Sequence, residues 1–468
     1  MEGRTNFFLV FIALIAGFGG FLLGFDSSMM ADAHDQIVKD LDLSNWQWSQ
    51  LISVSLFGSI FGIPLSGFFA DRLSRRFLLQ MVALGFIVSI LCCAWASSFT
   101  GLVVGRFFTG ICVGIAAYAT PLFIAEIAPP QRRGTLLLIN GLTITFGQAI
   151  AYLVGYMLHD YSAHSWRYLL MIASIPGVIL LFGMYFVPHA PRWIIKKRGI
   201  EQARLILRRI RPWDHNVDEE VSDISHALKY QSVKAPSLLK KPILFVLLLG
   251  IALGVAQQCS GINAIMYYGP VIFEAAGFFP VKNAILATFC IGLVNFFFTI
   301  ITLACVDKLG RRILLLSGTL IAALSLMTVT FLFNNFPDQK FSILLAFSLY
   351  VAGYCISVGS LFWVIISEIY PVQVRGLAMS IATVVQYLTN FIISLFFLGI
   401  YQELHQYTFS LFGLFCILAF ILIYFFVPET TGVSLEKIEE RLMDNYKIRD
   451  IGCNLSNKKT PSEIIAAQ

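Results

Sequence analysis

The chain contains the same short motifs twice, at nearly constant spacing. Glu126-Ile127-x-Pro129-x-Gln131-x-Arg133-Gly134 returns 242 residues later as Glu368-Ile369-x-Pro371-x-Gln373-x-Arg375-Gly376. Asp71-Arg72-x-x-Arg75-Arg76 returns 236 residues later as Asp307-Lys308-x-x-Arg311-Arg312, and Val187-Pro188 returns 240 residues later as Val427-Pro428. Such self-similarity indicates two related halves. In a membrane protein, two parallel halves usually enclose a substrate site at their interface.

Composition places these halves in a membrane. Hydrophobic residues make up 57% of the chain and charged residues 13%, and apolar runs of roughly 18 residues or more are typical of membrane spans. The first run is followed by no signal-peptide cleavage site, so we expect it to be retained as a helix. The twelve apolar runs lie near residues 7–24, 51–69, 78–96, 101–124, 136–158, 168–187, 243–268, 284–305, 313–333, 342–367, 377–399 and 408–427.

The basic residues predict the topology. A cytoplasmic N-terminus leaves only Lys39, Arg167, Lys282 and Lys340 of the 33 Lys and Arg residues outside, with Arg106 inside a span. Cytoplasmic loops should carry this excess. The net charge of +6 therefore reports orientation and contact with the anionic lipid bilayer, and it does not indicate a nucleic-acid partner. The nine Cys residues have no metal-like spacing, so we predict no metal site and no cofactor.

These observations predict an all-α membrane protein with twelve transmembrane helices in two pseudo-symmetric six-helix halves. The predicted parts are a first half at 1–188, a cytoplasmic amphipathic helical linker at 189–241, a second half at 242–428 and a cytoplasmic tail at 429–468. In the linker, Asp218, Glu219, Glu220 and Asp223 resemble a metal cluster, but we expect them on a solvated helix face. In the tail, the segment 434–439 predicts a short capped helix.

The duplicated charged motifs follow spans on the cytoplasmic side. Asp71 can pair with an Arg of the same half, and its duplicate Asp307 can do the same. Glu126 can pair with Arg132 or Arg133, and Glu368 with Arg375, within one half or between halves, which would hold the cytoplasmic mouth shut in one state. Exposed pairs of this kind are weak, about 0 to 1 kcal/mol each, which suits a gate. The alternative is that these charges only fix the topology. The predicted gate residues are Asp71, Arg72, Arg76, Glu126, Arg133, Asp307, Arg311, Glu368, Arg375 and Glu429.

Two charged residues fall inside or at the end of apolar runs. We expect Asp26 at the outer end of the first helix and Arg106 near the start of the fourth, where an isolated charge is costly and usually has a functional partner. Burial disfavours a charged carboxylate and a nearby cation favours it. A movement that changes the distance between the two groups would therefore act as a proton switch. The alternative is that Asp26 caps a helix end in solvent.

Neutral hydrogen-bonding side chains gather mainly in the second half. Gln257, Gln258, Asn263, Tyr267 and Tyr268 interrupt an apolar run around Gly261, which permits local unwinding. Three pairs share a helix face because they are four residues apart: Gln386 with Asn390, Gly359 with Trp363, and Ile144 with Gln148. Uncharged amides beside an aromatic plane suit a neutral polyhydroxyl ligand, whereas a phosphate or carboxylate would require Arg or Lys.

With these motifs in view, the chain resembles the sugar porter branch of the major facilitator superfamily from about residue 12 to 440. The motifs that carry the resemblance are Gly19-Gly20-x-x-x-Gly24-Phe25-Asp26, Asp71-Arg72-x-x-Arg75-Arg76, Gly105-Arg106-x-x-x-Gly110, Glu126-x-x-x-x-x-x-Arg133-Gly134, Gln257-Gln258-x-x-Gly261-Ile262-Asn263, Trp363-x-x-x-x-Glu368 and Pro428-Glu429-Thr430. Similarity to the family's bacterial proton symporters implies that Asp26 carries the proton, since facilitators have a non-ionisable residue there, and that Arg106 modulates it. It implies sugar contacts at Gln148, Gln257, Gln258, Asn263, Asn295, Trp363, Gln386 and Asn390.

The sequence departs from the family pattern at several positions. Gly141 stands where many relatives have a sugar-contacting Gln, Leu23 where an aromatic residue is frequent, and Tyr387 where Trp is common. The family's Pro-Glu-Ser-Pro-Arg motif reads Pro188-His189-Ala190-Pro191-Arg192, so one half lacks a carboxylate of the cytoplasmic network. These differences bear on which sugar is carried.

The leading prediction is a proton-coupled symporter that imports a neutral monosaccharide, a hexose such as glucose or galactose or a pentose such as xylose. The alternatives are a facilitative carrier of a sugar, inositol or another polyol, and a transporter-like sugar receptor, which the short tail disfavours. A membrane enzyme is not expected, because no catalytic or metal-ligand spacing lies at a span end. We expect a monomer in a bacterial inner membrane, with both termini cytoplasmic.

Overall fold

The computed structural model describes the backbone of residues 2–129, 133–211, 216–230, 240–371, 374–430, 440–443 and 451. It describes the side chains of the same residues other than 2–7, 70, 71, 133–135, 223, 226–230 and 307. The tail segment 434–439 lies outside this range. Within it, twelve helical segments are long and apolar enough to cross a membrane, as the sequence predicted.

The first six spans form one helical bundle. Serine side chains begin several of these helices: Ser44 and Gln47 cap α2 reciprocally, and Ser74 accepts a hydrogen bond from the Phe77 N–H at the start of α3. The last of the six spans, Ser165–Phe186, is built from two helices. The helices are α1 (Glu2–Leu41), α2 (Asn45–Arg72), α3 (Arg75–Trp95), α4 (Phe99–Ile127), α5 (Arg133–Leu158), α6 (Ser165–Ile172) and α7 (Ser174–Phe186).

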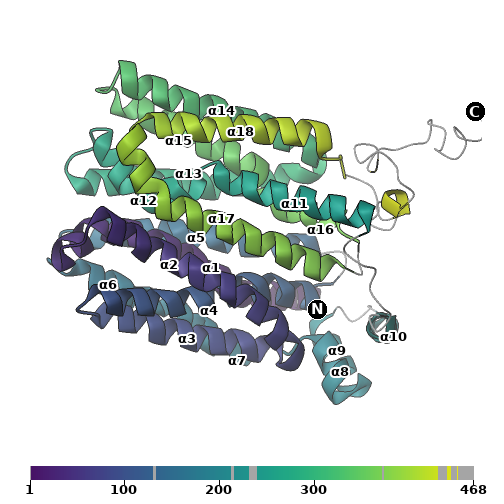
Figure 1. Cartoon of the computed structure of the whole chain (residues 1–468). Helices are drawn as coiled ribbons and strands as arrows, with labels where there is room; N and C mark the ends of the chain where they lie inside the picture. Colours follow the sequence, from purple (N-terminus) through teal and green to yellow (C-terminus); the bar gives the residue numbers. More distant parts are fainter. Residues whose placement is uncertain are drawn as a thin grey trace, which may run out of the picture.

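Three short helices follow this bundle, in the predicted linker. They are α8 (Pro191–Arg198), α9 (Ile200–Ile210) and α10 (Val217–Tyr230). Figure 1 shows them together at one end of the bundle, near the N-terminus. We call this the linker end and the opposite end the distal end.

The second six spans contain two breaks. Gly261 adopts φ +86° between α11 and α12, a left-handed conformation that glycine tolerates best; the predicted unwinding at this position is therefore observed. A π-helical turn also interrupts one span. The helices are α11 (Lys241–Cys259), α12 (Ile262–Ala275), α13 (Val281–Leu309), α14 (Arg311–Asn335), α15 (Lys340–Tyr354), the π-helix η2 (Cys355–Gly359), α16 (Ser360–Ile369), α17 (Arg375–Leu404) and α18 (Tyr407–Phe426).

The two halves lie side by side and meet along two helix pairs. In Figure 1 the helices of the first half occupy one side of the molecule and those of the second half the other. Across the boundary, α2 packs against α17 and α5 against α13. Within the first half, α1 packs on α5 and α2 on α4. The molecule therefore has the architecture of two six-helix halves with a helical linker that the sequence predicted.

Small residues bring α2 and α4 into close contact. Gly110 and Gly114 of α4 lie against the backbone of Ser55 and Ser59 in α2, so that a Cβ at either glycine would collide with it. The Ser59 hydroxyl donates a 2.9 Å hydrogen bond to the Gly110 carbonyl. Small residues four apart allow such approach between membrane helices, where packing and hydrogen bonds replace the hydrophobic effect.

One predicted boundary is wrong in a way that matters for function. The first span was expected at 7–24 with Asp26 at its outer end, but α1 continues to Leu41. Asp26 is therefore inside a helix and only 4% exposed. This excludes the alternative that it caps a helix end in solvent.

Candidate functional site

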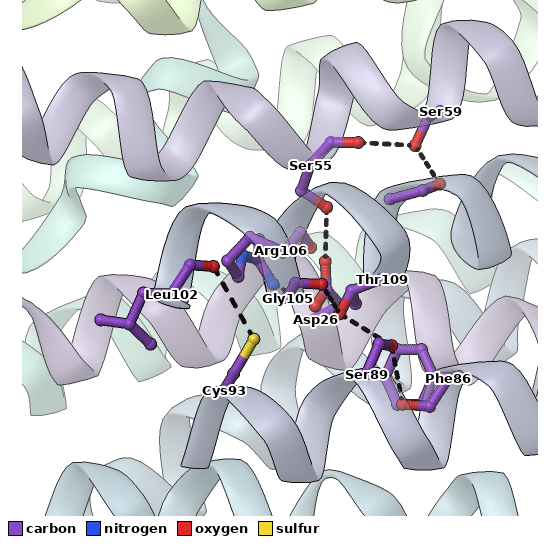
Figure 2. A network of polar contacts seen from close by, with 12 residues as sticks. Asp26, Ser55, Ser59, Phe86, Ser89, Cys93, Leu102, Gly105, Arg106 and Thr109 are labelled. Atoms are coloured by element: carbon purple, nitrogen blue, oxygen red, sulfur yellow. Dashed lines mark hydrogen bonds and ion pairs between the residues drawn. The ribbon is translucent and has the colours of Figure 1, made fainter. Parts of the chain in front are cut away.

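Asp26 and Arg106 form a buried ion pair between α1 and α4. The Arg106 guanidinium donates from Nη1 to Asp26 Oδ1, and both side chains are 5% exposed or less. Figure 2 shows the pair at the centre of a polar network drawn from several helices. The sequence-predicted partners are thus brought together. An unpaired charge at this depth would be costly, and here each group supplies the counter-charge of the other.

The same carboxylate also holds α2. Ser55 Oγ donates to Asp26 Oδ2 at 3.3 Å, and Ser59, one turn further along α2, donates to the Gly110 carbonyl on α4. Asp26 therefore ties three helices together through its two oxygens. Protonation of Asp26 would remove the ionic part of the contact with Arg106 and alter the packing of α1 against α2 and α4.

A hydrogen bond between amide side chains joins the two halves. Asn295 Nδ2 on α13 donates to Gln148 Oε1 on α5 at 2.8 Å, and Gln148 Nε2 donates to Ser27 Oγ on α1 at 3.4 Å. Ser27 directly follows Asp26, so this chain of amides starts beside the ion pair. On the other side of Asn295, the Cys355 thiol donates to Asn295 Oδ1 at 3.0 Å. Cys355 was not predicted as a site residue, because a lone Cys in an apolar run is usually a packing residue.

A second amide pair holds the π-helix. Gln257 Nε2 on α11 donates to the carbonyls of Val358 and Gly359 at 2.9 and 3.1 Å, and Gln386 Nε2 on α17 donates to Gln257 Oε1 at 2.5 Å. A π-helical turn frees carbonyl groups from the regular ladder and is frequent at functional sites. Here the freed carbonyls are bound by one of the predicted substrate residues.

The remaining predicted contacts lie nearby in the second half. Asn263 Nδ2 donates to Gln258 Oε1 at 2.7 Å, and Asn390 Nδ2 donates to the Tyr267 hydroxyl at 3.3 Å. Trp363 differs from these amides because 40% of its surface is exposed. Its ring contacts Phe362 edge to face at 5.1 Å, which leaves an aromatic surface uncovered in the span that carries the π-helix.

Taken together, the site is polar but uncharged apart from the Asp26 and Arg106 pair. Its amides bond to one another and to nearby hydroxyl and carbonyl groups, while Gln386 Oε1 has no hydrogen-bond partner among the described residues. Six of the amides are 7% exposed or less: Gln148, Gln257, Gln258, Asn295, Gln386 and Asn390. A ligand rich in hydroxyl groups could exchange these bonds for its own, since hydroxyls both donate and accept. Leaving buried amides unpaired would be costly.

At the linker end, the duplication in sequence appears as a duplication of ion pairs. Arg75 Nη2 lies 3.2 Å from Glu126 Oε1 in the first half, and Arg311 Nη2 lies 3.4 Å from Glu368 Oε1 in the second. Each pair joins helices of the same half. Arg75 was not among the predicted gate residues, although its equivalence to Arg311 at the 236-residue spacing could have pointed to it.

The next arginine of each motif, Arg76 in the first half and Arg312 in the second, donates to a backbone carbonyl at the end of another helix of its own half. Arg76 Nη2 donates to the Tyr185 carbonyl at 3.1 Å, and Arg312 Nη2 donates to the Tyr424 carbonyl at 2.8 Å. Arg375 donates from Nε to the Tyr370 carbonyl at 3.1 Å, and Arg72 lies 3.9 Å above the Phe68 ring. The side chains of Asp71, Arg133 and Asp307, also predicted for the gate, lie outside the described residues.

Glu429 caps a helix. Its two oxygens accept hydrogen bonds from the backbone N–H groups of Arg311 and Arg312 at 3.0 Å each, and Thr430 Oγ1 donates to Glu368 at 2.5 Å. A carboxylate at this position satisfies N–H groups that the start of α14 leaves unpaired. The cap residue of α14 itself is Gly310, which has no side chain to do so.

His189 occupies the equivalent position in the first half. There Ser74 caps α3 with its own hydroxyl, so the carboxylate that is absent at 189 is not needed for that helix start. The His189 ring stacks on Trp193 with 5.3 Å between centroids. Burial, together with Arg76 and Arg198 nearby, lowers the pKa of His189 below its ordinary value of 6.5.

The linker is fastened to the first half by Arg211. This side chain is 1% exposed, donates to the Ile127 carbonyl at the end of α4 at 2.7 Å, and makes a two-pronged contact with Glu220. The expectation that the acidic group lies on a solvated face holds for Asp218, which is 62% exposed. It is wrong for Glu220, because the buried guanidinium requires a counter-charge.

At the distal end, several bonds join one half to the other. Tyr152 of α5 donates to the Met266 carbonyl of α12 at 2.6 Å, and Lys282 Nζ of α13 lies 2.6 Å from Asp160 Oδ2, just after α5. The hydrogen bond from Lys282 lowers the pKa of Asp160. The Trp46 and Phe396 rings also meet across the halves. These contacts describe a distal end at which the two halves are closed on each other.

Comparison with known proteins fits this arrangement. Residues 12–442 match the family described as "Sugar (and other) transporter". The glucose transporter GlcP of Staphylococcus epidermidis is 34% identical over 450 residues, covering 95% of this chain and 99% of that protein. The galactose-proton symporter of Escherichia coli is 32% identical over 463 residues, covering 97% and 98%.

Solved structures show the same fold. The proton:xylose symporter XylE of the major facilitator superfamily, bound to 6-bromo-6-deoxy-D-glucose, aligns with a TM-score of 0.80 at 29% identity and covers 93% of this chain and 99% of its own. The inward open conformation of XylE from Escherichia coli also gives 0.80 at 29% identity, covering 92% and 98%. The resemblance stated from sequence motifs is confirmed, and the chain belongs to the "Sugar (and other) transporter" family.

Proposed function

We propose that this protein is a symporter that uses a proton gradient to import a neutral monosaccharide. The observation that carries this proposal is the buried ion pair of Asp26 and Arg106. The residue after Asp26, Ser27, accepts a hydrogen bond from Gln148, which in turn accepts one from Asn295 of the other half. A facilitative carrier would not need an ionisable group at position 26. The relatives that carry glucose, galactose with a proton, and xylose with a proton support the same class.

The proposed coupling follows from these contacts. A proton that reaches Asp26 neutralises the carboxylate, and the attraction to Arg106 loses its ionic part. Because Asp26 also binds Ser55 on α2, and α2 packs on α17 of the other half, the change reaches the boundary between the halves. Sugar hydroxyls that replace the bond between Gln148 and Asn295 act on the same boundary. Binding of the proton and binding of the sugar therefore both shift the equilibrium of the same movement between the two halves. Symport requires such shared control.

We also propose the orientation and the moving parts. The halves 1–188 and 242–428 rock against each other around the amide site, with 189–241 as a linker and 429–468 as a tail. The linker end faces the cytoplasm of a bacterial inner membrane, because Lys and Arg residues concentrate there. The gate and substrate residues predicted from the sequence act in these roles, and one chain works as a monomer in the lipid bilayer because both halves of the site belong to it.

Asp26→Asn tests the coupling. The amide keeps the shape of the carboxylate but cannot exchange a proton, so we expect loss of uphill sugar accumulation in proteoliposomes with an imposed pH gradient. Sugar exchange without a gradient should persist. A variant that still concentrates sugar would disprove the proton assignment, and Glu403→Gln, which removes an exposed carboxylate at the distal end of α17, is the matched control.

A further inference from the structure

Asp32 is a second carboxylate inside the first span, and the proposed function does not use it. It lies six residues beyond Asp26 in α1 and is 6% exposed. Within the described part of the chain, neither of its carboxylate oxygens has a hydrogen-bond partner. A buried ionised carboxylate without a partner is strongly disfavoured, and such groups remain neutral instead.

The Asp32 side chain lines a small cavity at the distal end. The cavity lies between α1, α5 and α6, and its polar lining includes Gln36, His159, Ser165 and Trp166. Gly155 on α5 leaves the space for the carboxylate, because a Cβ there would overlap the Asp32 side chain. The site is therefore shaped to hold this group, with space of about one water molecule.

Polar groups connect this cavity to the distal surface. Asp32, Gln36 and Asp40 follow at intervals of four residues and so form one stripe on α1. Gln36 donates to the His159 carbonyl at 2.9 Å and accepts from the Trp166 N–H at 2.8 Å, and so joins α1 to α6 and to the end of α5 beside the cavity. Asp40 accepts from the Trp166 indole at 3.0 Å at the surface. Asp26 points elsewhere, since six residues correspond to about 240° around a helix.

The cations near this part of α1 are engaged by other groups. Arg106 binds Asp26, and Arg167 donates to the carbonyls of Ala94 and Ala96. The titratable and charged residues on the surrounding elements include Tyr152 and Tyr156 on α5, His159 just after α5, Arg167 and Tyr168 on α6, Tyr267 and Tyr268 on α12, and Arg106 on α4, with Asp26, His34, Asp35, Lys39 and Asp40 on α1 itself.

The cavity adjoins a bond between the halves. Tyr152 lies one turn before Gly155 on α5, and its hydroxyl donates to the Met266 carbonyl of the second half at 2.6 Å. In the second half, α12 also packs on α1 beside this bond. Opening of the distal end would break the bond and move α12 away from α1 and α5. Water would then be able to reach Asp32 and hydrate its carboxylate, and closure would remove that water.

We propose that Asp32 is a second proton-binding site, one that senses the extracellular pH. The Asp32 carboxylate takes a proton from external water before the distal end closes, and the carboxylic acid returns it to the same side when that end reopens. No proton crosses the membrane at Asp32. Closure of the distal end therefore becomes slower as the external pH rises, without any change in the number of protons that accompany each sugar. This inference rests on the proposed alternating movement but not on coupling through Asp26.

The test uses sugar exchange in proteoliposomes at constant internal pH, with external pH varied from about 5.5 to about 8.5, a range in which buried carboxyl groups can titrate. Asp26→Asn serves as the background, which removes the coupling group. We expect exchange in this background to fall as the external pH rises. The double variant Asp26→Asn/Asp32→Asn should lose that dependence, while Asp26→Asn/Glu403→Gln should keep it. A flat profile in the single variant, or an unchanged profile in the Asp32 double variant, would overturn the proposal.

Two further measurements test the proposal without relying on transport or on the folding of the Asp32→Asn variant. Infrared spectra of the purified protein in lipid should contain the C=O band of a protonated acid near neutral pH, and Asp32→Asn should remove it whether or not a sugar is carried. Persistence of the band would count against the proposal. If Asp32→Asn fails to fold, Gly155→Ala provides the test instead. The added methyl group should displace the Asp32 carboxylate towards water and move the pH dependence of sugar exchange to lower pH. An unchanged pH dependence would also contradict the proposal.

Discussion

Asp26 and Asp32 are two carboxylates on the same helix, but their surroundings differ. Asp26 has a guanidinium and a serine hydroxyl within reach, so its charge is compensated. Asp32 has neither, and it faces a cavity whose other lining residues include no Lys, Arg, Asp or Glu. In the closed structure the first carboxylate therefore has a counter-charge, whereas the second has none to compensate a negative charge.

The amide site allows a prediction about affinity. Gln258→Ala removes the acceptor of the Asn263 amide, and we expect the binding of the best sugar to weaken by about 0.5 to 1.5 kcal/mol, as for the loss of one hydrogen bond. Calorimetric titration of purified protein measures this. Gln406→Ala, which removes an amide bonded to Asn334 at the distal end, should bind sugar as the parent does. Equal affinity in both variants would place the sugar elsewhere.

His189 predicts a dependence of stability on pH. Its pKa is lowered in the folded protein by burial and by Arg76 and Arg198, so the folded state holds the neutral ring while the unfolded chain takes up a proton near pH 6.5. The stability of the folded protein is therefore unaffected by the titration of His189 above that pH. It decreases as the pH falls from the pKa of the unfolded chain towards the lower pKa of the folded protein. Thermal unfolding midpoints of His189→Asn should decline less on acidification than those of the parent. Parallel curves for the two proteins would refute this.

At the scale of elements, the two halves solve the same problem with different residues. The start of α3 is capped by Ser74 from within, whereas the start of α14 follows Gly310 and is capped from a distance by Glu429. Gly310 has φ +88°, a conformation in which a serine would be strained. The start of α14 therefore depends on the Glu429 carboxylate. The start of α3 needs no such group, so His189 can occupy the equivalent position.

This asymmetry predicts unequal effects of equivalent substitutions. Glu429→Gln keeps the side-chain shape but removes the charge at the start of α14, and we expect a loss of about 0.5 to 2 kcal/mol in the free energy of unfolding, typical of helix caps and terminal charges. His189→Gln at the equivalent position should cost less, because Ser74 keeps its cap. Unfolding in detergent with increasing denaturant compares the two; equal losses would mean that the cap is unimportant.

The duplicated motifs predicted which charged residues gather at the linker end, but the partners depended on local context. Glu368 was expected to pair with Arg375 and Glu126 with Arg132 or Arg133, whereas the structure pairs Glu368 with Arg311 and Glu126 with Arg75. Asp26 was placed at a helix end because a carboxylate usually ends an apolar run. Arg106, which is 80 residues away, supplies the counter-charge that allows α1 to continue. Asp32 and Cys355 gave no signal, since their roles depend on a cavity and on a partner in another span.

At the scale of the whole molecule, the described bonds between the halves favour a structure closed at the distal end. Asn295 with Gln148, Tyr152 with the Met266 carbonyl, and Lys282 with Asp160 lie from the middle of the bundle towards that end. By contrast, the ion pairs of Arg75 and Arg311 at the linker end each lie within one half. The free energy of opening then depends on a small number of weak contacts.

This predicts how the resting population can be moved. Tyr152→Phe together with Lys282→Met removes two of the bonds between the halves, and we expect the distal end to open in a larger fraction of molecules, because a minor state held back by a few kcal/mol is about 0.1 to 10% populated. Cysteines introduced at Trp46 and Phe396, whose rings are 6.0 Å apart, should crosslink more slowly in the double variant than in the parent. The matched control is Lys340→Met, at a partly exposed lysine between other spans. Unchanged crosslinking would show that these bonds do not hold the distal end closed.

The attachment through Arg211 couples the linker to the membrane-spanning helices of the first half. The position of α9 therefore follows the movement of those helices. Because this buried side chain binds the end of α4 and Glu220 together, α9 must turn whenever the first six helices turn. A dye on the exposed face of α9, paired with one near the start of α14, would then record each transport cycle as a change in distance, read from the aqueous side without a label in the sugar path.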